Sequence, residues 1–208
     1  MKESLREKQR RQRTDAILNA ARELAQEIGY EAVTMDALAA RADVSKPTLY
    51  AYFPNKEAIA VASVVRSIQR GLVKLETLNG THTPLQILEA YFQWVLVGKY
   101  QECSLGFGSP NKEAVRSNPE YQVAFEEMMA RLTGLMEAGK VSGEIDPTLD
   151  TRAAIQTFVS IARDTEYHEL IAKKIITADV MISTRSAMLI RGLRTPASPS
   201  GPSSVRAK

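Results

Sequence analysis

The chain has 208 residues, 44% of them hydrophobic, so it can bury a sizeable core in one domain or in two small domains that share packing. Its net charge of +3 excludes a bulk polycation, so affinity for nucleic acid would have to come from local clusters of charge. Only 6% of residues are aromatic, good helix formers are abundant, and apolar residues recur with helical spacing, which predicts an all-α fold of about nine helices.

Basic residues dominate the first positions of the chain and are opposed there only by Glu3 and Glu7. They are Lys2, Arg6, Lys8, Arg10, Arg11 and Arg13. We predict a flexible basic arm over residues 1–12, which either contacts nucleic-acid phosphates or a minor groove or is simply a solvated tail. The first helix is predicted from about Thr14 to Ile28, because apolar residues share one face and Gly29 follows the last turn.

Residues 34–56 indicate two short helices joined by a tight turn. Thr34 is a good N-cap for the first helix and Ser45 for the second, with Pro47 in the first turn. Pro54 ends the second helix, because the residue before a proline is pushed out of the helical region. The pattern predicts a compact unit whose second helix keeps one polar face exposed.

That polar face suits nucleic acid. Ser45, Lys46 and Thr48 place donors in the first turn, where they can reach base edges. The hydroxyls of Tyr50 and Tyr52 suit phosphate oxygens. The alternative is that both tyrosines are half-buried packing residues.

The segment RTDAILNAARELAQEIGYEAVTMDALAARADVSKPTLYAYFPNKEAI, from Arg13 to Ile59, closely resembles the DNA-binding helix-turn-helix of the TetR family of bacterial repressors. The resemblance implies a DNA-binding domain over residues 13–55. It implies that Lys46, Pro47 and Thr48 read bases, and that the residues contacting phosphates are Thr34, Tyr50, Tyr52 and Lys56. Ala51 departs from family members that carry a bulky or polar residue at this position.

Residues 56–194 are predicted to form a helical body. A long helix from Lys56 to about Leu78 is followed by one from Pro84, by an irregular stretch over about 101–117, and by a helix from Pro119 to about Ala138. A short helix is possible at about 112–116. Asp146-Pro147 is expected to start the next helix, and the last helix spans about 173–191. The tail over 195–208 is rich in Pro, Ser and Gly and is predicted to be disordered.

The helices at about 147–169 and 173–192 are apolar on more than one side. We expect them to pair with a second copy as a four-helix bundle, an arrangement that the family resemblance also implies. The alternative is that they are only intramolecular core. A dimer would present two heads to a palindromic operator with half-sites about 34 Å apart.

A small-molecule pocket is expected in the body, lined by aromatic and methionine side chains that suit an apolar or aromatic effector. The candidates are Tyr91, Trp94, Phe107, Phe125, Met128, Met129, Phe158 and Tyr167. The alternative for each is ordinary core packing. A charged group at Arg163, Asp164, Glu166 and His168 could orient an effector, or could form a solvated face or interface salt bridges.

Features of enzymes are weak in this sequence. The two histidines, His82 and His168, lack metal-ligand spacing, and no phosphate-binding loop surrounds Phe107, so we expect no metal and no cofactor. The single cysteine, Cys103, fits a reducing cytoplasm and is either a small buried hydrophobe or a redox sensor. The charged N-terminus lacks the apolar segment of a secretory signal.

The sequence therefore favours a cytoplasmic, homodimeric repressor that an effector releases from its operator by shifting the population of two body arrangements. The alternative is a constitutive or activating DNA-binding regulator whose body docks a protein partner.

Overall fold

The computed structural model describes residues 4–101, 112–164 and 167–196. Over these ranges the chain forms ten α-helices and one 3₁₀ helix, and its only β-pairing is an isolated bridge between Ile145 and Arg194. The prediction of an all-α fold is confirmed. None of the described helices is both long enough and apolar enough to cross a bilayer. Cys103, Phe107, Glu166 and the tail beyond residue 196 lie outside the described residues.

The N-terminal head consists of α1 (Leu5–Ile28), the 3₁₀ helix η1 (Tyr30–Ala32), α2 (Met35–Arg41) and α3 (Lys46–Tyr52). Its apolar core joins α1 to α2 and α3 through fully buried leucine and isoleucine side chains, and it continues into the first turn of the next helix at Ile59. Gly29, with φ of +80°, lets the chain turn out of α1.

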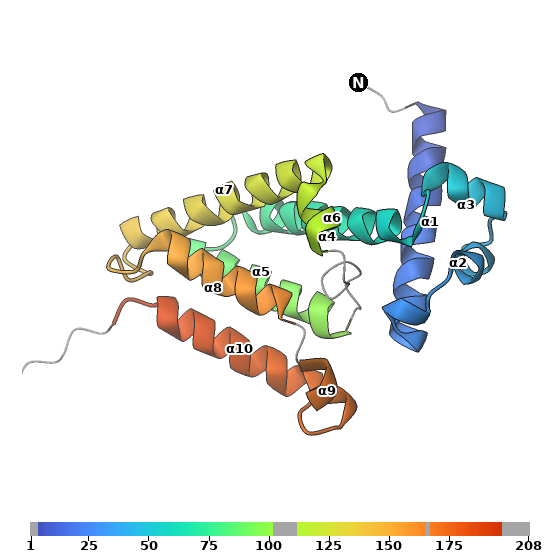
Figure 1. Ribbon diagram of the computed structural model, residues 1–208. Helices are drawn as coiled ribbons and strands as arrows, with labels where there is room; N and C mark the ends of the chain where they lie inside the picture. The colour runs from blue at the N-terminus through green and yellow to red at the C-terminus, as the bar shows by residue number, and fades with distance from the viewer. Residues whose placement is uncertain (1–3, 102–111, 165–166, 197–208) are drawn as a thin grey trace, which may run out of the picture.

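The predicted flexible arm is wrong over residues 5–12, because α1 begins at Leu5 rather than near Thr14. A capping box starts the helix: the Ser4 hydroxyl accepts from the Glu7 amide at 3.2 Å, and the Glu7 carboxylate accepts from the Ser4 amide at 2.8 Å. The basic residues after Glu7 are therefore held on a helix that extends beyond the head core (Figure 1).

The body begins with α4 (Lys56–Leu78), which runs out of the head and packs against α5 (Pro84–Gln101), α6 (Lys112–Ser117) and α7 (Pro119–Val141). The remaining helices are α8 (Thr151–Arg163), α9 (Tyr167–Ala172) and α10 (Ala178–Leu193). α5 packs against α4, α7, α8 and α10, and α8 also packs against α7 (Figure 1). α4 is thus the helix that belongs to both the head and the body.

Two predicted helix starts in the body are wrong. Asp146 accepts bonds from the backbone and hydroxyl of Thr148 in a turn, and α8 starts only at Thr151 with Asp150 as its N-cap. The predicted last helix at about 173–191 also starts later, because Lys174 has a φ of +56° and Thr177 caps α10. The stretch predicted as one helix at about 147–169 contains α8 and the start of α9.

Candidate nucleic-acid interface

α3 is held on the head by a small number of local interactions. The Ser45 hydroxyl accepts from the Thr48 amide at 3.3 Å and lies 2.7 Å from the Thr48 hydroxyl, so the first turn is capped as predicted. Leu49 is fully buried and Phe53 nearly so, which fixes the inner face of the helix. The outer face, which includes Lys46, Pro47, Tyr50 and Ala51, is exposed and carries no carboxylate.

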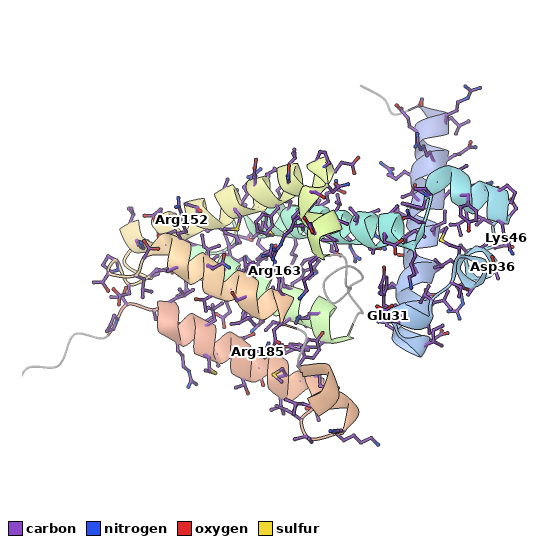
Figure 2. All side chains as sticks on the ribbon, viewed as in Figure 1. Glu31, Asp36, Lys46, Arg152, Arg163 and Arg185 are labelled. Carbon is purple, nitrogen blue, oxygen red and sulfur yellow. The ribbon has the colours of Figure 1, made fainter. Side chains whose placement is uncertain are left out.

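Lys46 is paired in this state. Its ammonium group lies 2.7 Å from the Asp36 carboxylate of α2, and Figure 2 places both residues on the side of the head away from the body. Their side chains are 60% and 65% exposed, so the pair contributes little to stability and Lys46 can exchange this partner for another acceptor.

The two tyrosines of α3 differ in their surroundings. Tyr50 is 51% exposed. Tyr52 is half-buried and packs against the head core, which also contains Leu49 and Phe53. The packing interpretation therefore fits Tyr52 and does not fit Tyr50.

Thr34 and Lys56 also have structural roles. The Thr34 hydroxyl caps α2 by accepting from the Ala37 amide at 3.2 Å. The Lys56 ammonium donates to the carbonyl oxygens of Tyr30 and Glu31, each at 3.3 Å, and lies 4.6 Å from the centre of the Tyr30 ring. Lys56 thus ties the first turn of α4 to η1.

A groove of about 790 Å³ runs between α1 and the helix-turn-helix. Arg6, Arg10 and Arg13 lie on successive turns of α1 and form its basic wall, and the opposite wall is made by Ala42–Val44 and by Ala51 and Tyr52. The sequence did not predict this groove, because the basic residues were expected to form a mobile arm rather than part of α1. The Ser4-x-x-Glu7 capping box was the available signal.

Among the residues that the structure describes, the effector candidates do not all line one cavity. Tyr91, Trp94 and Phe158 form one aromatic group, with ring centroids 6.1 Å apart for Tyr91 and Trp94 and 5.8 Å apart for Tyr91 and Phe158. The cavity beside Tyr91 and Phe158 has a volume of only about 20 Å³, which is room for about one water molecule. Met128 is buried and Met129 is half-buried along α7.

Two other effector candidates, Phe125 and Tyr167, each lie beside a cationic side chain. Phe125 is stacked on Tyr121 at 5.5 Å, and the Arg163 guanidinium donates to the Tyr121 hydroxyl at 2.8 Å and lies 5.0 Å from the Phe125 ring centre. Tyr167 packs edge-on against Tyr100 at 4.4 Å. Arg163 is therefore engaged with α7 rather than with solvent alone, which the sequence analysis had left open.

The comparisons with known proteins agree with this geometry. The model of "Bacterial regulatory proteins, tetR family" matches residues 17–62, which span α1 to the start of α4. The HTH-type transcriptional repressor KstR of Mycolicibacterium smegmatis is 32% identical over 186 residues, covering 87% of this chain and 78% of KstR. This chain belongs to the TetR family. It is accordingly a DNA-binding transcriptional regulator rather than an enzyme.

Solved structures extend the likeness over the body of this TetR-family chain. The fatty acid degradation regulator FadR from Bacillus halodurans has a TM-score of 0.67 at 19% identity, covering 94% of this chain and all of FadR. AibR, solved in complex with isovaleryl coenzyme A and operator DNA, has a TM-score of 0.61 at 19% identity, covering 86% of this chain and 98% of AibR. These two likenesses show that this chain shares its fold, head and body, with FadR and AibR.

Proposed function

We propose that the protein is a homodimeric repressor that reads a palindromic operator through α3 and leaves it when a small molecule binds the body. The observation that carries this proposal is the outer face of α3. There, Lys46 and Tyr50 are exposed on a helix that is capped by Ser45, anchored by Leu49 and free of carboxylates. A rigid helix with donors in its first turn suits base edges in a major groove.

The flanking residues supply the phosphate contacts in this proposal. Thr34 precedes α2 and Lys56 begins α4, whereas Tyr50 and Tyr52 lie on α3 itself. The arginines of α1 form the basic wall of the neighbouring groove. Contacts of this kind set the register of the head on DNA without reading its sequence. Base reading is assigned to Ser45, Lys46, Pro47 and Thr48.

We assign the dimer contact to α8 and α10. Val180 is 49% exposed and Met188 is 71% exposed, and their spacing of eight residues places both on one face of α10. Exposed apolar side chains on a long helix are typical of an interface between subunits. A four-helix bundle of α8 and α10 from two copies would couple the two heads through their bodies.

The link between body and head in this proposal is α4. Its first turn is tied to η1 through Lys56, and its far half, including Ile68 and Leu75, is buried in the core of the body. A ligand that shifts the body between two arrangements would move α4 and with it the spacing of the heads. The structure of AibR, which contains both isovaleryl coenzyme A and operator DNA, supports the proposal that a protein of this fold binds both a small molecule and DNA.

The small volume of the cavity beside Tyr91 and Phe158 also supports a second candidate function, in which the body docks a protein partner. A regulator whose body docks a protein partner needs no internal cavity, and the exposed apolar side chains of α10 could serve that partner instead. The two functions differ in their response to small molecules. Release from DNA by a small molecule alone would favour the repressor, whereas release only by a protein would favour docking.

The test of the DNA-binding part is selection of bound duplexes from a random pool with the full chain. We expect enriched sequences that contain two inverted copies of one short motif. Lys46→Ala should relax base preference at one position in each copy, while Lys112→Ala, an exposed lysine of the body, should leave the motif unchanged. Enrichment of sequences without twofold symmetry, or a motif that Lys46→Ala leaves intact, would contradict the proposal.

A further inference from the structure

A cationic cluster joins the ends of α5 and α8 to the middle of α10. The Lys99 ammonium, near the end of α5, donates to the backbone oxygens of Ala162, at 2.9 Å, and of Asp164 at the end of α8. Arg185 of α10 donates to the Asp164 carboxylate at 2.6 Å. Figure 2 labels Arg185 on α10, the helix that lies along α5.

Among the described side chains, the cluster carries more positive than negative charge, and it is largely shielded from solvent. Among the side chains that the structure describes, Lys99 and Arg185 face one carboxylate, that of Asp164, and the side chains of Arg185 and Asp164 are only 23% and 25% exposed. Burial lowers the pKa of Lys99 to about 8, and repulsion from Arg185 acts in the same direction against the attraction of Asp164. Excess buried charge is unfavourable unless an ion of opposite sign neutralises it.

Two buried donors of this cluster also lack an acceptor. Arg185 Nη1 and the Tyr100 hydroxyl are buried, and neither has a hydrogen-bond partner among the residues described. Their groups are neighbours, because the Arg185 guanidinium lies 5.8 Å from the centre of the Tyr100 ring. The Arg185 guanidinium is near enough to the Tyr100 hydroxyl to act on its pKa, but neither atom makes a hydrogen bond of good geometry. Buried polar atoms are nearly always bonded, so the two together indicate a missing acceptor. An oxyanion would satisfy both donors and balance the charge.

An apolar seam leads away from this cluster. On α5, Tyr100 continues a row of side chains four residues apart that includes Leu88, Phe92 and Leu96. On α10, Arg185 begins a row that continues with Leu189 and Leu193. The small cavity is lined by Leu88, Phe92, Leu189 and Leu193, so the two helices run antiparallel and the cavity lies about 12 Å along the seam from Tyr100.

We propose that Lys99, Tyr100 and Arg185 form a binding site for the carboxylate of an organic acid whose apolar part lies along the seam between α5 and α10. That this acid is the effector rests on the proposed function. A bound carboxylate competes with Asp164 for Arg185. It therefore loosens the end of α8, one of the helices assigned to the dimer contact.

The experiment titrates the full-length protein, without DNA, with sodium hexanoate, octanoate and decanoate, each paired with the straight-chain alcohol of the same length. The single tryptophan, Trp94, lies on α5 and reports by its fluorescence. We expect saturable binding of the carboxylates that tightens with chain length, and binding of each matched alcohol that is weaker by about tenfold or more. Equal binding of acid and alcohol would overturn the proposal.

Variants of the cluster residues test whether octanoate binds at Lys99, Tyr100 and Arg185. Arg185→Gln should weaken octanoate binding by about tenfold, and Tyr100→Phe, which removes only one hydroxyl donor, by about three- to tenfold. Arg152→Gln changes an exposed arginine of α8 and should leave binding unchanged. Thermal melting checks that each variant folds, and if Arg185→Gln fails this check, Tyr100→Phe carries the test.

Wild-type affinity for octanoate in every folded cluster variant would overturn the proposed site. Because these titrations contain no DNA, their failure is separate from the failure of the proposed function. A protein that selects a symmetric operator but binds no carboxylate contradicts only the site. A protein that binds octanoate through Arg185 but selects no DNA contradicts only the operator proposal.

Discussion

Arg66 of α4 donates through Nη1 to both the backbone oxygen of Asp15, at 3.2 Å, and its carboxylate, at 3.3 Å, on α1. The arginine side chain is only 19% exposed, so this contact is protected from solvent. Lys56 makes the other polar attachment of α4 described above, ten residues or about 15 Å earlier along the helix. With two attachments at that separation, α4 and the head should move as one rigid body.

Removing the later attachment should loosen the head without unfolding the body. We expect Arg66→Gln to speed amide hydrogen exchange in the middle of α1 by several-fold, because a charge-assisted bond of this kind contributes about 1–2 kcal/mol. Arg70→Gln, on an exposed position of the same helix, is the control. Equal exchange in the two variants would show that the Asp15 contact does not hold α1 to α4.

Phosphate contacts should weaken DNA binding without changing its sequence preference. Lys56→Ala should lower affinity for specific and random duplexes alike and reduce the slope of log affinity against log salt by about one unit. Tyr50→Phe should lower affinity on all sequences with the slope unchanged, because it removes a hydroxyl and no charge. Because Lys56 also binds the carbonyls of η1, its variant must melt as a folded protein before the slope is compared. A wild-type salt slope in Lys56→Ala would contradict a phosphate role.

Local signals in the sequence predicted much of the head. Thr34, Ser45 and Asn55 each cap a helix as expected, since a cap depends only on residues within one turn. The same kind of signal misplaced the start of α8, because both Asp146 and Asp150 can cap and only packing decides between them.

Contacts between distant residues were not predictable. Lys99 meets Asp164 across 65 residues, and Arg185 meets Asp164 across 21, so no spacing rule brings them together. The aromatic candidates were chosen for chemistry alone, and the structure separates Tyr167 and Phe125 from the group around Tyr91. Side-chain type indicates what a residue can bind, whereas tertiary packing decides what lies beside it.

The approach of α4 to α5 depends on Gly71. A methyl group there would lie 2.8 Å from the Tyr91 hydroxyl and 3.5 Å from the Trp94 ring, and Tyr91 is almost fully buried. We expect Gly71→Ala to destabilise the protein by about 1–3 kcal/mol and to shift Trp94 fluorescence. Gly134→Ala, at an open position of α7, should instead be neutral or stabilising by about 0.5–1 kcal/mol. Equal free energies of unfolding in urea for Gly71→Ala and Gly134→Ala would contradict the close contact between Gly71 and Tyr91.

Lys99 should make stability depend on pH. Its pKa is about 8 in the folded protein against an ordinary value of 10.5, so between these values the unfolded chain binds a proton that the folded protein has released. The contribution of Lys99 to the free energy of unfolding therefore rises with pH across this window. Its charged and titrating neighbours are Asp164, Arg185, Tyr100 and Tyr167, and burial raises the pKa of Tyr100 above its ordinary value.

The comparison is between wild type and Lys99→Met, which keeps the apolar stem and removes the titrating group. Urea unfolding at about pH 7.5 and about pH 10 should show wild type gaining stability relative to the variant as pH rises. Parallel changes in the two proteins would mean that Lys99 keeps its ordinary pKa and is not buried as described.

The central claim is that two α3 helices, coupled through their bodies, bind two half-sites together. The most direct measurement is affinity for the selected operator and for the same operator with about five base pairs inserted between its halves, which rotates one half-site by about half a turn. We predict that the insertion lowers affinity by roughly 100-fold, to the level of an isolated half-site. Equal affinity for the two duplexes would contradict the claim.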